Sequence, residues 1–185
     1  AEERWTGSLP YENEAKTTGP SPEFNWKDYD INDFYSGKGD LMKSITDATD
    51  PDLRSFLRDH DGRLIIYHGW ADTLIVGEDT VDYFEEMVNA TFGGDLKTAS
   101  EKARLFMAPG MGHCGGGPGP NTWDKLDPMV DWVENGIAPD HVVAEHFTDG
   151  VVDNQRPICT YPKQAEYIGS ISGANDPKNW VAENF

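Results

Sequence analysis

Basic side chains are scarce in this sequence. Its 185 residues include 15 Lys and Arg against 33 Asp and Glu, so the formal net charge is −18 at pH 7. A surface with this excess of negative charge repels nucleic acid phosphates and anionic lipids, so we expect neither nucleic acid nor a membrane as a partner. The charge favours solubility and carries no information about the fold.

Long apolar runs are missing as well. No stretch approaches the roughly 20 apolar residues that a membrane-spanning helix requires. The chain does not open with a basic segment followed by an apolar one, which is the pattern of a secretory signal. We expect either that the protein has no signal peptide or that the signal lies outside this chain.

Several chemical signatures are also absent. The cysteines are Cys114 and Cys159 alone, too few for a disulfide framework, and nothing in the local sequence requires them to pair. No P-loop or G-x-G-x-x-G precedes a helical pattern, so a phosphate-binding loop is not expected. A zinc site built from His113, Cys114 and a third ligand remains an alternative, although no HxxxH or CxxC spacing supports it.

What the chain does contain is enough apolar material for a core, with 37% hydrophobic and 11% aromatic residues. Two short apolar runs, residues 63–68 and 103–109, predict strands buried on both faces. A helical pattern follows each of them, at 77–92 and 122–136. The positions expected to face the core are Val81, Phe84 and Val88 in the first helix and Leu126, Met129, Val130 and Val133 in the second. This order predicts an α/β fold with parallel strands and flanking helices.

The chain is expected to have three parts. Residues 1–50 read as an irregular segment, because clusters of Gly, Pro, Asn and Asp interrupt every periodic pattern there. Residues 51–146 read as the α/β core, which begins with a short helix within 50–62 capped by an Asp. Residues 147–185 read as a mostly irregular C-terminal segment with one short strand at most.

Two loops of the predicted core carry residues suited to acid–base chemistry. The stretch "HGWADTLI" after the first strand offers Asp72, and "APGMGHCGGGPGP" after the second offers His113. Adjacent parallel strands lie about 4.8 Å apart, so loops at their carboxyl ends can bring a carboxylate to an imidazole. An Asp in that position fixes the tautomer of the His and stabilises the imidazolium. The order Asp then His, across one helix and one strand, is that of an α/β-hydrolase.

Simpler interpretations of these residues stay open at this point. Asp72 would serve equally well as a cap of the next helix, and His113 as an ordinary loop residue. His68 ends a strand and is expected to hydrogen-bond the backbone. The remaining histidines read as surface residues: His60, His141 and His146. No G-x-S-x-G nucleophile motif occurs anywhere, so the residues alone give an acid and a base without a nucleophile.

Four motifs in series resemble the C-terminal part of the tannase and feruloyl esterase family: "LIIYHGWAD", "FMAPGMGHCGGGPGP", "DWVENGIAP" and "RPICTYP". An earlier segment, "FNWKDYDIND", is similar to the stretch where that family's lid returns to the hydrolase core. The resemblance implies the C-terminal part of an α/β-hydrolase that cleaves esters of aromatic acids such as gallate or hydroxycinnamate. It matches Asp72 to the family's catalytic acid and His113 to its base.

The resemblance also carries expectations about cysteines and metals. The family's nucleophile is a Ser in a Cys-Ser-x-Gly-Gly motif, whose Cys forms a disulfide to the Cys after the catalytic His. Cys114 matches that second Cys, so its partner is expected in an upstream half of the enzyme. Cys159 matches an "RPxC" cysteine whose usual partner has no counterpart here, so we expect it to be free. The family's lid calcium site is absent from this sequence, and no cofactor or metal is expected in this chain.

Two functions follow from these observations. In the first, the chain supplies Asp72 and His113 to a secreted or periplasmic serine esterase whose Ser lies upstream, and the isolated chain is inactive. In the second, it is a truncated paralogue that binds or self-associates through an open sheet edge and unmatched apolar surface. A Cys-Ser-x-Gly-Gly coding stretch upstream in the reading frame would favour the first.

Overall fold

The computed structural model describes residues 32, 44–113, 115–170 and 173–184. The chain divides into two compact units, Ala1–Asp50 and Pro51–Phe185. Most of the first unit, which is the segment 1–50 expected to be irregular, lies outside the described residues. The second unit contains a π-helical turn and then the following elements: β1 Leu64–Gly69, α3 Gly77–Phe92, α4 Leu96–Ala99, β2 Ala103–Ala108, α5 Asp127–Asn135, β3 His141–Thr148, β4 Val151–Cys159, β5 Lys163–Tyr167 and β6 Trp180–Asn184.

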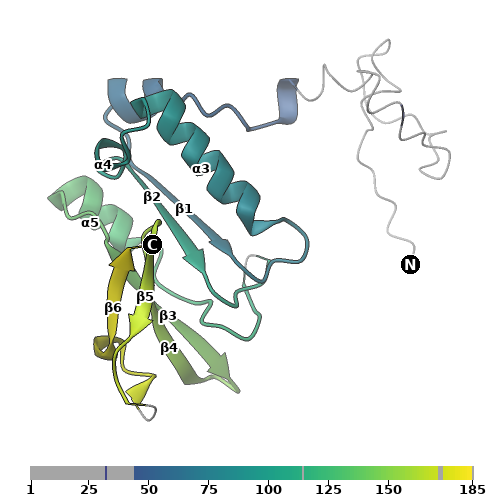
Figure 1. The fold of residues 1–185 in the computed structure, drawn as a ribbon, viewed down its shortest axis with the longest axis vertical. Coiled ribbons are helices and arrows are strands. Elements are labelled where there is room, and N and C mark those ends of the chain that lie inside the picture. The colour runs from purple at the N-terminus through teal and green to yellow at the C-terminus, as the bar shows by residue number, and fades with distance from the viewer. Residues whose placement is uncertain (1–31, 33–43, 114, 171–172, 185) are drawn as a thin grey trace. The chain divides into compact units, whose positions relative to one another are not determined.

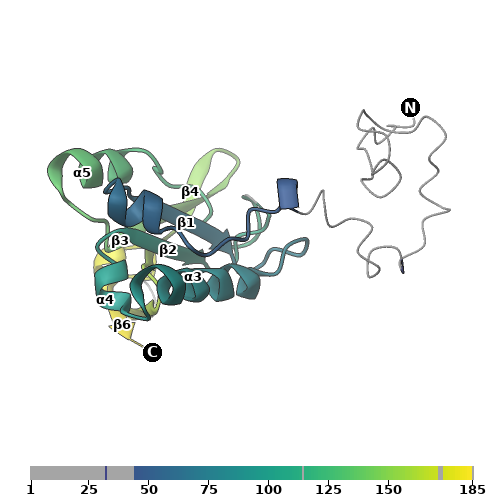
Figure 2. The ribbon, with the colours of Figure 1, turned by 90° about the horizontal axis from the view of Figure 1, so that it is seen from above.

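Strands β1 and β2 are parallel and adjacent, in register from Leu64 opposite Ala103 to Gly69 opposite Ala108. Helix α3 connects them through α4, so the predicted strand–helix–strand unit is confirmed (Figure 1). Five of the six β2 residues are buried, as expected for a strand covered on both faces. Figure 2 shows α3 and α4 on one side of this strand pair and α5 on the other.

Alternation along β2 divides the core into two clusters. Leu105 and Met107 face α3, where Phe84 and Met87 are 1% and 0% exposed. The opposite face of β2 packs against the β3–β4 hairpin, in a cluster of six buried residues: Phe106, Ala108, Met111, Val142, Ala144 and Ile158. Because β2 belongs to both clusters, the loop at its carboxyl end is anchored on both sides.

The expectation that residues 147–185 are mostly irregular is wrong. β3 and β4 form an antiparallel hairpin, and β5 and β6 form a second one. The turn of the first hairpin holds Asp149 and Gly150 at φ angles of 52° and 79°. Two successive positive φ angles match the twist of flanking strands in a two-residue hairpin turn, and Asp-Gly is a preferred sequence for it. The Asp-Gly pair was therefore a usable signal that the sequence interpretation missed.

Two helical expectations also need correction. The helix expected within 50–62 is reduced to a π-helical turn at Ser55–Asp59, which still buries Leu57. In α5 the buried side chain is Trp132, at 3% exposed, whereas Leu126 and Val133 are 67% and 63% exposed. Arg104 of β2 lies 5.7 Å above the Trp132 ring, so the Trp132 side of α5 is the side that faces β2.

Parts of the second unit remain uncovered. No strand among the described residues pairs with the second edge of β1. The exposed stripe on and beside α5 consists of Leu126, Val130, Val133 and Ile137. No helix in the described part of the chain has the length and apolar character needed to cross a membrane.

Candidate functional site

Asp72 and His113 meet at the carboxyl end of the β1–β2 pair. Asp72 lies in the loop after β1, and His113 in the glycine-rich loop after β2. His113 Nδ1 lies 2.8 Å from Asp72 Oδ2. The sequence-based expectation that these side chains lie within hydrogen-bonding distance is confirmed.

The Asp72 carboxylate is held on both of its oxygens. Oδ1 accepts hydrogen bonds from the backbone amides of Leu74 and Ile75, at 2.8 and 3.0 Å. Oδ2 faces His113, and the Asp72 side chain is 3% exposed. Helix α3 begins only at Gly77, so Asp72 shapes the turn before the helix and does not cap it.

The environment of Asp72 favours its charged form. Burial on its own raises the pKa of this carboxyl group, but hydrogen bonds to the carboxylate outweigh that effect. The donors, in order of decreasing effect, are the Ile75 amide, the His113 imidazole, the Leu74 amide and the His68 imidazole. Together they hold the pKa of Asp72 well below its usual range. The carboxylate is therefore ionised at neutral pH and available to orient an imidazole.

Backbone hydrogen bonds join the two loops that carry this pair. Trp70 donates to the carbonyl of Ala108, and Ala71 donates to that of Met111, each at 3.0 Å. Gly69 permits this approach, because a Cβ there would lie 2.2 Å from the Met111 carbonyl oxygen. The separation of Asp72 and His113 thus depends on main-chain contacts and not on flexible side chains.

The glycines of the second loop let it fold back on itself. Gly119 donates to the carbonyl of Gly110, and Gly112 donates to that of Gly116, each at 3.0 Å. A Cβ at Gly119 would lie 2.1 Å from the Pro109 carbonyl oxygen, so a larger residue would force this loop apart. His113 projects from a narrow, hydrogen-bonded turn.

The free side of the His113 ring is accessible. Its side chain is 41% exposed. Among the described residues, no hydrogen bond to His113 Nε2 is found. Since Asp72 accepts a hydrogen bond from the Nδ1–H group, Nε2 is the unprotonated, basic nitrogen of the neutral ring. The arrangement suits an imidazole that takes a proton at Nε2 and returns it.

His68 is a third member of the site that the sequence interpretation placed wrongly. It was expected to hydrogen-bond the backbone. Instead, His68 Nε2 lies 3.1 Å from Asp72 Oδ2, and His68 Nδ1 lies 2.6 Å from Thr80 Oγ1. The four-residue spacing between His68 and Asp72, across a turn at the strand end, is the sequence signal that could have indicated this contact.

The other histidines lie away from the site. His60 and His141 are exposed, as expected. His146, also expected to be an ordinary surface residue, is half-buried and lies 2.6 Å from Asp153 Oδ1 within the β3–β4 hairpin. This second His–Asp pair has a geometry similar to the first and provides an internal control.

The cysteine and metal expectations have different outcomes. Cys114, with its expected disulfide, lies outside the described residues. Cys159 is buried and forms no disulfide among the described residues, and burial raises the pKa of its thiol. In the part of the chain that the structure describes, no group of three or more His, Cys, Asp or Glu side chains is placed to hold a metal ion. The zinc alternative therefore gains no support from the described histidines and carboxylates.

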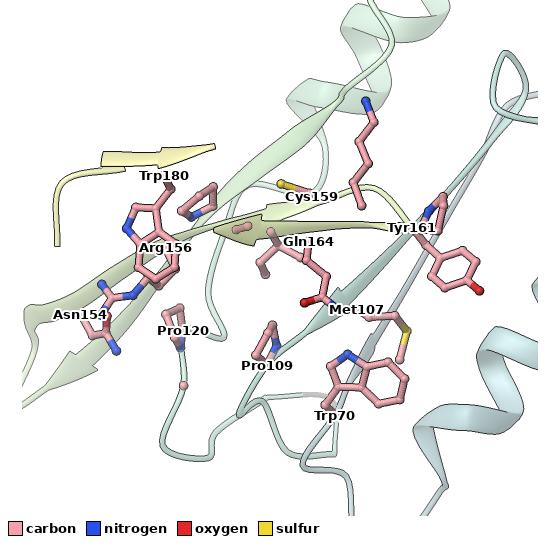
Figure 3. A pocket seen from close by; sticks show the side chains of 16 residues that line it. Trp70, Met107, Pro109, Pro120, Asn154, Arg156, Cys159, Tyr161, Gln164 and Trp180 are labelled. Atoms are coloured by element: carbon pink, nitrogen blue, oxygen red, sulfur yellow. The ribbon is translucent and has the colours of Figure 1, made fainter. Parts of the chain in front are cut away.

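A largely apolar cavity of about 550 Å³ adjoins the two loops. Trp70 and Pro109, from the Asp72 and His113 loops, form one wall, and Arg156 and Trp180 face them from the C-terminal hairpins (Figure 3). Arg156 lies 4.8 Å above the Trp180 ring. Neither Asp72 nor His113 lines this cavity, so it is a neighbour of the pair and does not contain it.

Comparisons with known proteins agree on one family. The family model described as "Tannase and feruloyl esterase" matches residues 13–179. The chain is 42% identical over 151 residues to mono(2-hydroxyethyl) terephthalate hydrolase of Piscinibacter sakaiensis, which covers 77% of this chain and 24% of that protein. It is 34% identical over 149 residues to feruloyl esterase B of Aspergillus niger, which covers 72% of this chain and 28% of the relative.

A solved structure extends the likeness to the fold. An esterase from Aspergillus oryzae superposes with a TM-score of 0.72 at 27% identity, over 88% of this chain and 35% of the solved chain. The C-terminal α/β-hydrolase interpretation of the sequence is thereby confirmed. The chain spans 24% to 35% of the length of these three proteins.

Proposed function

The chain belongs to the tannase and feruloyl esterase family, and we propose that it supplies the acid and the base of a serine ester hydrolase. The observation that carries the proposal is the 2.8 Å contact between His113 Nδ1 and Asp72 Oδ2 at the ends of adjacent parallel strands. The nucleophilic Ser would lie outside these 185 residues, since the sequence contains no G-x-S-x-G and no Cys-Ser-x-Gly-Gly.

The proposed reaction transfers protons at the Nε2 atom of His113, while Asp72 holds Nδ1. Its Nε2 takes the proton of the Ser hydroxyl as the Ser oxygen attacks the ester carbonyl, and Asp72 stabilises the imidazolium that forms. The imidazolium then gives this proton to the departing alcohol, which leaves an acyl-enzyme. A water molecule, deprotonated by the same Nε2, releases the carboxylic acid and restores the Ser.

We propose esters of aromatic acids as the substrate class. The names of the relatives refer to a terephthalate ester and to feruloyl esters, and both are esters of aromatic carboxylic acids. We further propose a disulfide from Cys114 to the upstream half of the enzyme. Because such a bond needs an oxidising compartment, the proposal includes a secreted or periplasmic location.

The uncovered surfaces of the second unit support an upstream partner. One edge of β1 has no pairing strand among the described residues, and the stripe with Leu126, Val133 and Ile137 leaves large apolar side chains exposed. In this proposal, both surfaces are covered by the upstream half of the same hydrolase.

The same surfaces favour one alternative, a catalytically incompetent paralogue that self-associates. Sedimentation of the 185-residue chain with and without its upstream half separates the two. We expect a complex of one copy of each half. Dimers that persist unchanged when the upstream half is added would favour the alternative.

A fluorophosphonate probe tests the serine assignment directly. We expect the joined halves to be labelled at a Ser in the upstream Cys-Ser-x-Gly-Gly stretch, and His113→Ala to slow that labelling by several orders of magnitude. His146→Ala is the matched control, because His146 pairs with a different Asp, and it should leave labelling unchanged. Labelling within the 185-residue chain instead would contradict the proposal.

A further inference from the structure

One carboxylate oxygen in this site faces two imidazoles. Asp72 Oδ2 lies 2.8 Å from His113 Nδ1 and 3.1 Å from His68 Nε2. The His68 side chain is 13% exposed, so it is packed within the site and not at its rim. The proposed reaction requires His113 and Asp72 but gives His68 no task.

The proton positions on His68 follow from its neighbours. An ionised carboxylate only accepts hydrogen bonds, so the hydrogen facing Asp72 must belong to His68 Nε2. In a neutral ring, Nδ1 is then the acceptor, and the Thr80 hydroxyl at 2.6 Å is the donor. Thr80 lies in the first turn of α3, and its hydroxyl holds the nitrogen of His68 that the contact with Asp72 leaves unprotonated.

We propose that Thr80 and His68 act as positioning residues, which fix the rotation of the Asp72 carboxylate so that its Oδ2 points at His113. This proposal rests on the function proposed above. The Leu74 and Ile75 amides hold Oδ1, and the two imidazole N–H groups converge on Oδ2. The hydrogen bonds run in one direction, from Thr80 to His68 to Asp72, with His113 donating to the same oxygen. Through these hydrogen bonds Thr80, in the helix after β1, is connected to His113, in the loop after β2.

The tautomers can be measured on the 185-residue chain without any activity. Long-range ¹⁵N–¹H correlation spectra at a pH where the imidazoles are neutral distinguish protonated from unprotonated ring nitrogens. We expect His68 to carry its proton on Nε2 and His113 on Nδ1. A His68 protonated on Nδ1 in the wild-type chain would overturn the proposal, whatever the activity of the full enzyme.

Two substitutions at Thr80 separate positioning from packing. Thr80→Val keeps the shape and removes the hydroxyl, so we expect the His68 ring to lose one of its two hydrogen bonds and the His113 Nδ1–H signal to broaden. Thr80→Ser restores the donor and should restore the sharp signal. A His113 Nδ1–H signal that is unchanged in Thr80→Val, in a chain whose amide spectrum shows a folded core, would contradict the assignment.

The joined enzyme provides a second readout. We expect His68→Phe to lower kcat about tenfold, the scale of one lost hydrogen bond to a charged group, with KM changed by less than about twofold. His146→Phe makes the same substitution in the other His–Asp pair and should leave kcat unchanged. An unchanged kcat in His68→Phe would count against the proposal. If the wild-type joined enzyme were inactive, the proposed function would fail, and the tautomer measurement would still decide the role of His68.

Discussion

Asp72 and His113 form a 2.8 Å hydrogen bond although they are 41 residues apart in the sequence. The contact exists because β1 and β2 are parallel neighbours, and because Gly69 lets the two following loops approach within backbone hydrogen-bond distance. A carboxylate with a lowered pKa thus faces an imidazole whose other nitrogen is open to solvent.

The two oxygens of Asp72 have separable roles. Asp72→Asn keeps an acceptor for the Leu74 and Ile75 amides but cannot accept from His113 through its amide nitrogen. We expect a normally folded protein whose joined form has kcat lowered about 10⁴-fold, the scale known for a wrongly oriented triad His. Asp72→Ala removes both roles and should also loosen the turn, seen as faster amide exchange at Leu74. An Asp72→Asn enzyme within about tenfold of wild type would contradict the orienting role.

The approach of the two loops predicts a contrast between neighbouring glycines. Gly69→Ala places a Cβ 2.2 Å from a backbone oxygen of Met111, so we expect a loss of about 1–3 kcal/mol in unfolding free energy. Gly77→Ala meets only the Trp70 ring and the Met107 methyl, at 3.1 and 3.4 Å, and both can shift. It also favours helix, so we expect no loss. Thermal unfolding of the two variants measures the contrast, and equal melting temperatures would argue against backbone contact between the loops.

Tyr161 predicts a pH dependence at the alkaline end. Its hydroxyl donates to Glu85 of α3, and that hydrogen bond, aided by burial, raises the pKa of Tyr161 to about 12. A raised pKa contributes stability that is complete below the ordinary value of 10.0 and is lost as the pH rises towards 12. Tyr161→Phe should therefore lose less stability than wild type across that interval in urea unfolding. Parallel stability curves for the two proteins would show that the hydrogen bond is not formed in solution.

Cys159 predicts a protected thiol. It is buried at 8% exposure, and burial raises the pKa of its thiol, so little reactive thiolate is present at neutral pH. We expect alkylation of Cys159 to be slow in the folded chain and fast in urea, followed by mass spectrometry of its peptide. Rapid alkylation without urea, or a disulfide to Cys114, would count against both the burial and the family assignment of the two cysteines.

Much of this arrangement could be predicted because its determinants are local. The apolar runs around Ile65 and Leu105 specify buried strands without reference to the rest of the chain. Once β1 and β2 are parallel neighbours, their carboxyl ends coincide, and the pairing of Asp72 with His113 follows. The four motifs then led to the family that the comparisons confirm.

The features that were missed depend on contacts distant in sequence or on weak patterns. The role of His68 depends on the rotamer and hydroxyl of Thr80, which periodicity does not reveal. The buried face of α5 carries Trp132, which lies against Arg104 of the distant strand β2, so the helical pattern alone selected the wrong stripe. Residues 147–185 carry polar and apolar side chains without clear alternation, and only the Asp149–Gly150 turn indicated the hairpin.

Turnover of an aromatic ester by the chain alone, by the joined halves and by their His113→Ala variant tests the central claim most directly. A complete enzyme that loses one triad member keeps about 10³–10⁴-fold catalysis from its oxyanion hole and binding site. The 185-residue chain contains neither G-x-S-x-G nor Cys-Ser-x-Gly-Gly, and we expect it to show no turnover of methyl ferulate. Joining the upstream half should give turnover, and His113→Ala should remove all but that residual rate. Hydrolysis by the chain alone that persists in His113→Ala would contradict the account.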